Sequence, residues 1–191
     1  ACLVGSEMCI RDRYDPCCGS GTILIEGAMM AHNIAPGINR NFECDRWGFI
    51  PEKAWIQERE RCHDIIKTDT DFVAFGSDID FHALELTMAN AKRIKVDKFL
   101  RLETADIKDF NPTTEKGTLI TNPPYGERML DVKTAKNIYH IMGEKFVSKH
   151  GWSYGIISPD EEFEREFGRK ADKRRKLYNG MIKCQYYMYF K

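Results

Sequence analysis

Tyr14-Asp15-Pro16-Cys17-Cys18-Gly19-Ser20-Gly21-Thr22 is a glycine turn that sets the architecture of the chain. It precedes a run from Ile23 to Asn33 that has no helix breaker except Gly27 and is apolar on most faces. Such a run is typical of a helix packed against a sheet. Glycines between a strand and a helix let a ligand approach the backbone and meet the helix N–H groups. We therefore predict a strand, a tight turn and a helix here. Taken alone, the turn favours a plain strand-to-helix connection; together with the Asn122-Pro123-Pro124-Tyr125 motif described below, it favours a ligand-binding turn.

Strand-like and helix-like segments alternate through the following residues. A β-rich segment from Phe72 to Asp80 ends in two carboxylates, and a helix with Leu84, Met88 and Ala91 on one stripe comes next. Further strands are predicted at 100–104, 118–121 and 154–157, with a helix between the last two. Strands that alternate with helices predict a mainly parallel sheet covered on both faces.

Two segments depart from this alternation. Residues 34–50 are irregular and polar and predict a loop insertion, after which Trp55, Arg59, Cys62 and Ile66 recur at helical spacing. At the other end, strand-like runs at 175–178 and 182–190 are joined by Asn179-Gly180, a strong hairpin signal. The fold class is therefore α/β, with an antiparallel hairpin that ends a mainly parallel sheet.

The composition limits the classes of function. The 191 residues include 29 basic and 29 acidic side chains and have no net charge, which excludes a uniformly basic coat for nucleic acid. A role in RNA or DNA binding must depend on a local patch or pocket. No apolar run is long enough to span a bilayer, and none near the start resembles a signal peptide, so we expect no membrane and a cytoplasmic protein.

Several cofactor and metal classes lack their motifs. The seven cysteines include no C-x-x-C pair and predict free thiols, and no histidine pattern predicts a metal site. A dinucleotide-binding turn would have a glycine at position 24, where the chain has Leu24. No G-x-x-x-x-G-K-[ST] loop is present either. NAD and ATP are therefore poor candidates.

Asn122-Pro123-Pro124-Tyr125 is the most informative motif of the chain and directly follows the strand predicted at 118–121. Two successive prolines end a central strand in a stiff loop, at the edge where open α/β sheets bind ligands. The Asn122 amide oxygen and the Pro123 carbonyl become fixed acceptors there, and Tyr125 offers a stacking surface. This combination suits an exocyclic amino group on a nucleobase.

The glycine turn, Asp78, Asp106 and Asn122-Pro123-Pro124-Tyr125, in this order, resemble a class I S-adenosylmethionine-dependent amino-methyltransferase. Additional motifs at 33–37, 76–80, 121–128 and 176–180 resemble the THUMP-associated bacterial 23S ribosomal RNA guanine-N2 methyltransferases. This resemblance covers 14–191 and implies a Rossmann-like class I methyltransferase fold with a mainly parallel seven-stranded sheet. It also implies transfer of a methyl group from S-adenosyl-L-methionine to the N2 amine of a guanine in large-subunit ribosomal RNA.

The resemblance also assigns residues to the site. The methionine part of the cofactor would lie near Asp15 and the turn; Asp78 would accept hydrogen bonds from the ribose and Asp106 from the adenine amino group. The full expected cofactor set is Asp15, Cys18, Gly19, Ser20, Gly21, Thr22, Asp78, Ile79, Asp106, Ile107 and Asn122. The expected catalytic set that holds the guanine is Asn122, Pro123, Pro124 and Tyr125.

Other residues have competing interpretations. Asp80 is interpreted as a helix N-cap, and the Cys17 and Cys18 thiols have no histidine partner nearby that would make them nucleophiles. The basic run Arg169, Lys170, Lys173, Arg174, Arg175 and Lys176 is either an RNA phosphate contact or a solvated surface. The aromatic residues Phe42, Trp47, Phe49 and Trp55 either stack on bases or belong to a core.

Alternatives remain for the function and for the chain itself. An adenine-N6 methyltransferase on DNA or RNA would use the same Asn-Pro-Pro-Tyr motif, and a non-catalytic RNA-binding module could use a truncated methyltransferase fold. Residues 1–13 do not match the family, and we expect them to be an artefactual leader before a catalytic domain at 14–191. The RNA-capturing THUMP region of the family would then be missing. The oligomeric state stays open.

Overall fold

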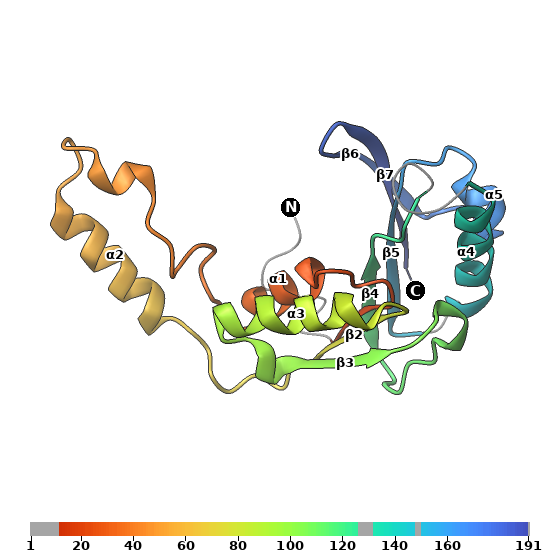
Figure 1. The fold of residues 1–191 in the computed structure, drawn as a ribbon, viewed down its shortest axis with the longest axis horizontal. Coiled ribbons are helices and arrows are strands. Elements are labelled where there is room, and N and C mark those ends of the chain that lie inside the picture. Colours follow the sequence, from red (N-terminus) through yellow and green to blue (C-terminus); the bar gives the residue numbers. More distant parts are fainter. Residues whose placement is uncertain (1–11, 126–131, 148–149, 191) are drawn as a thin grey trace.

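The computed structural model describes residues 12–125, 132–147 and 150–190, which form a seven-stranded sheet flanked by helices (Figure 1). The strands lie in the order β3-β2-β1-β4-β5-β7-β6. Their bounds are Arg13–Asp15 (β1), Ala74–Asp78 (β2), Leu100–Thr104 (β3), Gly117–Thr121 (β4), Trp152–Ser158 (β5), Lys173–Asn179 (β6) and Ile182–Tyr189 (β7).

The strand directions confirm the predicted fold class. β1 is parallel to β2 and to β4, β2 is parallel to β3, and β4 is parallel to β5. β7 is antiparallel to both β5 and β6. The sheet is therefore mainly parallel and ends in the antiparallel hairpin that the sequence predicts.

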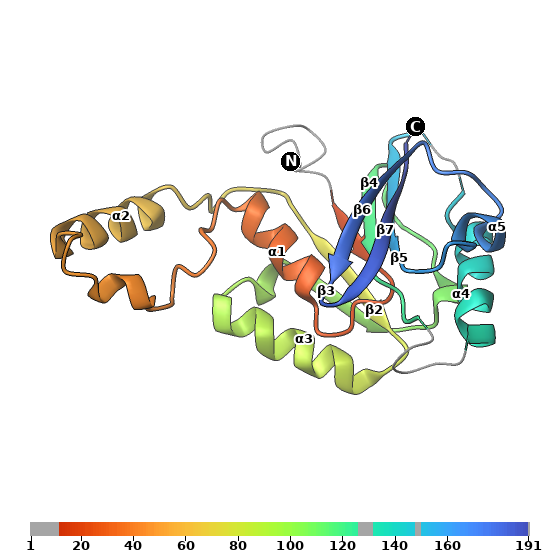
Figure 2. The same cartoon turned by 90° about the horizontal axis from the view of Figure 1, so that it is seen from above.

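Helices cover both faces of the sheet. α1 (Thr22–Ala31) and α3 (Phe81–Ile94) pack over β1, β2 and β3, whereas α4 (Val132–Lys145) and α5 (Phe163–Phe167) pack over β4, β5 and β7 (Figure 2). Within β2, Ala74 belongs to the hydrophobic cluster under α1 and α3. The next residue, Phe75, packs against the hydrophobic cluster under α4 and α5. This division follows from the two-residue period of a strand. The described residues also form the short 3-10 helices η1 (Glu43–Arg46), η2 (Asp97–Phe99) and η3 (Ile107–Asp109).

The turn of the C-terminal hairpin lies one residue later than predicted. Asn179 pairs with Ile182 in the last rung of the hairpin, so the two loop residues are Gly180 and Met181. Gly180 has a φ of 62° at the first loop position, where type II′ turns favour glycine. Asn179 is therefore a strand residue and not part of the turn.

Residues 34–66 form an arm that extends away from the sheet (Figures 1 and 2). The arm contains the predicted loop and α2 (Glu52–Asp64), which has Pro51 as its N-cap and ends two residues before Ile66, the last residue of the predicted helical stripe. None of the α2 residues is buried. Arg59 links the helix to the loop, because it donates hydrogen bonds to the carbonyl of Arg40 (2.9 Å) and the carboxylate of Asp45 (2.6 Å).

Hydrogen bonds join the two ends of the arm where it meets the body of the domain. The Lys67 N–H donates to the His32 carbonyl (2.8 Å), and the His32 Nδ1 atom lies 2.9 Å from the Lys67 carbonyl oxygen. The Asn33 side chain donates to the carbonyl of Ile65 (3.0 Å). His32 is fully buried and stacks on Phe99 with 3.5 Å between the ring centroids. The arm is thus anchored to the body through one buried histidine.

The first described residues belong to the sheet. β1 begins at Arg13, and the carbonyl of Asp12 accepts a hydrogen bond from the Thr118 N–H (2.9 Å). Asp12 and Arg13 fall inside the expected leader at 1–13, whose first eleven residues lie outside the described residues. The division into 1–13 and 14–191 stays a prediction.

The described helices and cysteines can be compared with the expectations for a membrane span and for disulfides. Among the helices that the structure describes, none is long and apolar enough to cross a membrane. Cys17, Cys18, Cys44 and Cys62 are free thiols, as predicted.

Replacement of Gly143 in α4 by alanine is expected to lower the free energy of unfolding by about 1–3 kcal/mol. A Cβ atom at this position would overlap with the carbonyl oxygen of Phe167 at the end of α5. This overlap outweighs the roughly 1 kcal/mol by which alanine is the better helix former. Urea unfolding followed by circular dichroism measures the change.

Gly48→Ala is the matched control, because a Cβ atom there meets no atom within 4 Å. Its free energy of unfolding should stay within about 0.5 kcal/mol of the wild type. Equal stability of the two variants would contradict the close packing of α4 on α5.

Candidate functional site

A cavity of about 610 Å³ lies where β1, β2, β3 and β4 end. β2 and β3 lie on one side of β1 in the sheet, and β4 lies on the other side. The strand order therefore reverses between β1 and β4. Open α/β sheets bind their ligands at such a switch point. The position of the cavity therefore agrees with that predicted from the motifs.

The glycine turn after β1 is held by α3. Gly21 is the N-cap of α1 with a φ of 79°, and a Cβ atom there would overlap with the side chain of Thr87. Thr87 also donates a hydrogen bond to the Gly19 carbonyl (2.7 Å). Asn90 donates to the carbonyl of Ser20 (3.1 Å). These contacts explain why the close approach of α3 requires glycine at position 21.

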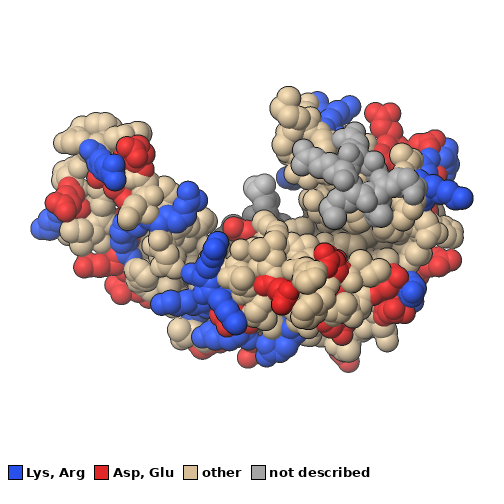
Figure 3. Space-filling view, viewed as in Figure 1, with Lys and Arg blue, Asp and Glu red and all other residues tan. Residues whose placement is uncertain are grey.

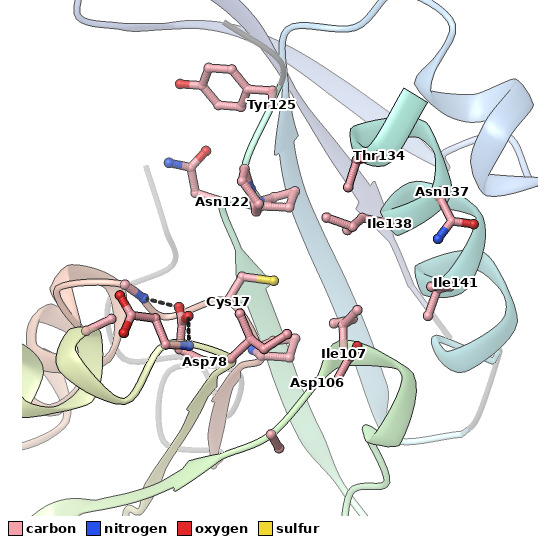
Figure 4. Close-up of a pocket in the computed structure, with 18 residues that line it drawn as sticks. Cys17, Asp78, Asp106, Ile107, Asn122, Tyr125, Thr134, Asn137, Ile138 and Ile141 are labelled. Carbon is pink, nitrogen blue, oxygen red and sulfur yellow. Dashed lines mark hydrogen bonds between the residues drawn. The ribbon is translucent and has the colours of Figure 1, made fainter. Parts of the chain in front are cut away.

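Asp78 connects the end of β2 to this turn. Its carboxylate accepts hydrogen bonds from the Gly19 N–H (2.9 Å) and the Asp80 N–H (3.0 Å), both drawn in Figure 4. Each carboxylate oxygen keeps a further lone pair for a ligand. Asp80 accepts from the His82 N–H (2.9 Å) and is the N-cap of α3, as predicted.

Asp15 lies beneath the cavity and not on its wall. It is 2% exposed, and its Oδ1 accepts hydrogen bonds from the Thr121 hydroxyl (2.7 Å) and the Cys17 N–H (3.2 Å). Burial raises the pKa of this carboxyl from 3.8 to about 7, and the charge of Asp78 contributes to the rise. A buried carboxyl group thus links the last residues of β1 and β4.

The two cysteines of the turn are poor nucleophiles. Burial raises the pKa of the Cys18 thiol to about 12, and burial together with the charges of Asp15 and Asp78 raises the pKa of Cys17 well above its usual range. Both thiols therefore stay protonated at neutral pH. This agrees with their interpretation as small residues near a ligand.

The end of β3 places a carboxylate and an apolar side chain at the cavity. Asp106 is the N-cap of η3 and accepts from the Lys108 N–H (3.0 Å). This bond and the nearby Lys108 ammonium (3.2 Å) lower the pKa of Asp106. Ile107 is buried and lines the cavity, whereas Ile79, after β2, is an exposed part of its wall.

The Asn-Pro-Pro-Tyr loop carries the most unusual polar atom of the site. The Oδ1 atom of Asn122 is buried and has no hydrogen-bond partner among the described residues. Tyr125 points to the same side of the loop as Asn122 (Figure 4), and its hydroxyl accepts a hydrogen bond from the Asn179 amide (2.7 Å). The end of the resembling motif, 126–128, lies outside the described residues.

The structure brings most of the predicted site residues to one cavity and places the others behind it. The wall includes Gly19, Asp78, Ile79, Asp106, Ile107, Asn122, Pro123, Pro124 and Tyr125. The predicted residues absent from the wall are Asp15, Cys18, Ser20, Gly21 and Thr22. In this second group, Asp15 and Cys18 are buried, Ser20 is an exposed residue of the turn, and Gly21 and Thr22 form the start of α1.

The sequence analysis missed the wall that α4 provides. Thr134, Asn137, Ile138 and Ile141 line the cavity opposite the turn (Figure 4). Their helical spacing was visible, but the same spacing is typical of an ordinary core stripe. Only the fold shows that this stripe faces a cavity.

The predicted basic run divides into packed and exposed residues. Arg169 lies over the ring of Tyr189 (4.6 Å) and donates to the Phe146 carbonyl (3.3 Å), and Arg174 forms an ion pair with Glu164 (3.3 Å). All three contacts lie within the chain. Arg169 is partly buried, whereas Lys170, Lys173, Arg174, Arg175 and Lys176 are exposed.

The aromatic residues of the arm are not a core. Phe42, Trp47 and Phe49 are 40%, 50% and 78% exposed, and Trp55 is half-buried. The predicted alternative of a core is therefore wrong for the first three.

A sequence profile of the UPF0020 family, described as "RMKL-like, methyltransferase domain", matches residues 11–188. The chain is 39% identical over 180 residues to the putative RNA methyltransferase YpsC of Bacillus subtilis, and the match covers 94% of this chain and 47% of that protein. It is 37% identical over 180 residues to the ribosomal RNA large subunit methyltransferase K/L of Shewanella amazonensis, with coverage of 92% and 25%. The chain thus spans about half of one relative and a quarter of the other.

Solved structures of methyltransferases also resemble this chain. The putative methyltransferase SMU.472, complexed with SAH, superposes with a TM-score of 0.91 at 38% identity, over 98% of this chain and 50% of that chain. A predicted N6-adenine-specific DNA methylase from Listeria monocytogenes superposes with a TM-score of 0.86 at 36% identity, over 94% and 46%.

The buried Asp15 carboxyl is expected to make stability fall as the pH rises between about 4 and 7. Because its pKa is higher in the folded protein than in the unfolded chain, its contribution to stability is complete below about pH 4 and is lost as the pH rises through 7. The free energy of unfolding should fall by about 1.4 kcal/mol for each pH unit, relative to Asp15→Asn. Urea unfolding of both proteins across this range measures the difference. A constant difference would contradict the raised pKa.

Proposed function

Because the chain belongs to the UPF0020 family of RMKL-like methyltransferase domains, we propose that it methylates the exocyclic N2 amine of a guanine in large-subunit ribosomal RNA. The chain is a methyltransferase domain of class I fold, and its cofactor is S-adenosyl-L-methionine. The observation that carries the proposal is the Asn122 Oδ1 atom, a buried acceptor with no partner in the described part of the chain. Such an atom is costly unless a ligand satisfies it.

The cavity fits the cofactor in size and in chemistry. Its volume of about 610 Å³ lies in the range of small-molecule sites. The carboxylates of Asp78 and Asp106 are acceptors suited to ribose hydroxyls and to the adenine amino group. Ile107 and Ile138 provide apolar walls for the adenine ring, and the turn at 19–21 suits the methionine end. When bound, the cofactor supplies a methyl group activated by a positively charged sulfur.

The loop after β4 is the proposed site for the target amine. Asn122 Oδ1 and the Pro123 carbonyl would each accept one N–H of the amine, so that its lone pair has one direction. The two prolines restrict the loop, and the acceptors therefore need little reorganisation when the base binds. The amine becomes acidic as it attacks, so a backbone carbonyl or water can accept the proton. We assign no side chain as a base.

Tyr125 is the proposed stacking surface for the target base. An aromatic ring beside the acceptor pair holds a flipped base in the plane that the hydrogen bonds require. The Asn179 amide restrains this ring through the 2.7 Å hydrogen bond to the Tyr125 hydroxyl. The tip of the β6–β7 hairpin thus supports the Asn-Pro-Pro-Tyr loop.

A second candidate is an adenine-N6 methyltransferase on DNA or RNA. An amide oxygen and a carbonyl can accept from the adenine amine equally well, and a similar solved structure is named a predicted N6-adenine-specific DNA methylase. Incubation with labelled cofactor and either ribosomal RNA or DNA, followed by nucleoside analysis, separates the two. Labelled N2-methylguanosine supports the proposal, whereas labelled N6-methyladenine contradicts it.

A third candidate is a non-catalytic RNA-binding module. The relatives are longer than this chain, and we propose that a THUMP region elsewhere in such proteins captures the RNA. We place the activity in the cytoplasm, the compartment of bacterial ribosomal RNA. Calorimetry with S-adenosylmethionine distinguishes this candidate, because a folded chain without affinity for the cofactor would favour the non-catalytic module.

Asn122→Ala is expected to lower turnover by at least about 100-fold, because one of two amine acceptors is lost. The thermal melting temperature should stay close to that of the wild type, since this oxygen has no partner among the described residues. A radiolabel transfer assay on ribosomal RNA measures turnover. Full turnover by a normally folded variant would refute the proposed role of the loop.

Tyr125→Phe and Asn179→Ala should each lower kcat/KM for RNA by about 2–10-fold, the value of one hydrogen bond. If Asn179 acts through Tyr125, the double variant should be no worse than either single variant. Cofactor affinity, measured by calorimetry, should not change. Additive losses in the double variant would mean that Asn179 does not act by positioning Tyr125.

A further inference from the structure

A second cluster of basic residues, formed by residues 92–101 and Lys67, lies where the arm meets the body of the domain, outside the proposed active site. We call this place the root of the arm. From Lys92 to Arg101 the chain carries five basic residues and a single acid, Asp97. In a chain with no net charge, this segment is a pronounced local excess of positive charge.

Folding brings a further lysine to this segment. Lys67, at the end of the arm, lies with Lys95 and Lys98 around a cavity of about 220 Å³ that His63 also lines. Lys95 follows α3, and Lys98 belongs to η2. Figure 3 shows basic side chains gathered where the arm meets the body. Three cationic side chains from two distant segments therefore converge on one concave surface.

These charges are not neutralised within the described part of the chain. No described carboxylate forms an ion pair with Lys67, Lys95 or Lys98. The Lys98 ammonium instead lies 4.8 Å from the centre of the Phe99 ring. Since like charges repel each other, an external anion is the natural complement of this surface.

The surface has a rigid support. The buried His32 ring stacks on Phe99, next to Lys98, and is within hydrogen-bond distance of the Lys67 carbonyl. Lys95 has a φ of 63° as the C-cap of α3, and its N–H bonds to the Lys92 carbonyl. Because the backbone of all three lysines is held in place, little conformational freedom of the backbone is lost when a ligand binds.

The arm itself adds exposed aromatic rings. Trp47 and Phe49 stack on each other with 5.6 Å between their centroids and are 50% and 78% exposed. Two ion pairs lie within the arm, Arg59–Asp45 and Arg61–Glu58. The arm therefore offers stacking surfaces, and its root offers positive charge.

We propose that the arm and its root bind the RNA strand outside the target-nucleotide pocket. Lys67, Lys95 and Lys98 contact phosphates, and Trp47 and Phe49 stack on bases. Lysines hold a phosphate backbone as point charges without reading its sequence, and aromatic stacking tolerates any base. This inference rests on the proposed function only in taking RNA as the substrate.

The test compares Lys95→Glu/Lys98→Glu with the control Lys116→Glu/Lys145→Glu, which changes the net charge equally at sites near β4 and at the end of α4. The probe is fluorescently labelled ribosomal RNA transcript, titrated at several salt concentrations. Each lost phosphate contact should reduce the slope of log K against log salt by about 0.7–0.9, so the first variant should lose about 1.4–1.8. Its affinity at low salt should fall at least about 10-fold, whereas the control should match the wild type.

Trp47→Ala/Phe49→Ala tests the stacking contribution separately. This variant should bind RNA at least about 5-fold more weakly with an unchanged salt slope, because stacking releases no counterions. Circular dichroism and calorimetry with the cofactor verify the fold of each variant. If the charge reversal disturbs folding, Lys67→Gln/Lys98→Gln takes its place with the same expected reduction in slope.

An unchanged salt slope in a folded lysine variant overturns the proposal and makes the arm a candidate for binding a protein. Methyl transfer by the wild type is measured independently. Loss of slope without transfer of a methyl group to guanine would therefore refute the proposed function and support the RNA surface. Methyl transfer to guanine by the wild type, together with an unchanged salt slope in the lysine variant, would support the proposed function and refute the RNA surface.

Discussion

The Thr121 hydroxyl donates a 2.7 Å hydrogen bond to the Asp15 carboxyl, and this buried contact joins residues 106 positions apart in the chain. It connects the last residues of β1 and β4, the two strands between which the sheet order reverses. Asp15 also accepts from the Cys17 N–H and so shapes the glycine turn. The turn that faces the cofactor and the loop that faces the base therefore share one support.

The lack of net charge conceals a strongly uneven surface. In the C-terminal basic run, Arg169 packs within the molecule and the exposed Arg174 forms an ion pair with Glu164, whereas the other four residues are exposed. Lys67, Lys95 and Lys98, at the root of the arm, form no ion pair with a described carboxylate. A count of charges along the chain does not distinguish these cases, because availability depends on what folds against each side chain.

Two distant elements complete the site around the motifs. α4 forms the cavity wall opposite the glycine turn, and the β6–β7 hairpin reaches the Asn-Pro-Pro-Tyr loop through Asn179. The hairpin contact depends on the turn being Gly180–Met181, which leaves Asn179 in the strand. A shift of one residue would turn the Asn179 side chain to the other face of the hairpin.

Local patterns were enough to predict the alternation of strands and helices, the terminal hairpin and the motifs at the ends of β1, β2, β3 and β4. They were enough because periodicity, glycine turns and proline pairs act over a few residues, and parallel strands bring their carboxyl ends to one edge. The Asp15–Thr121 bond, the α4 wall, the Asn179–Tyr125 contact and the lysine cluster at the arm were decided by tertiary structure. Each joins segments far apart in the chain, where side chains meet only through the packing of the whole sheet.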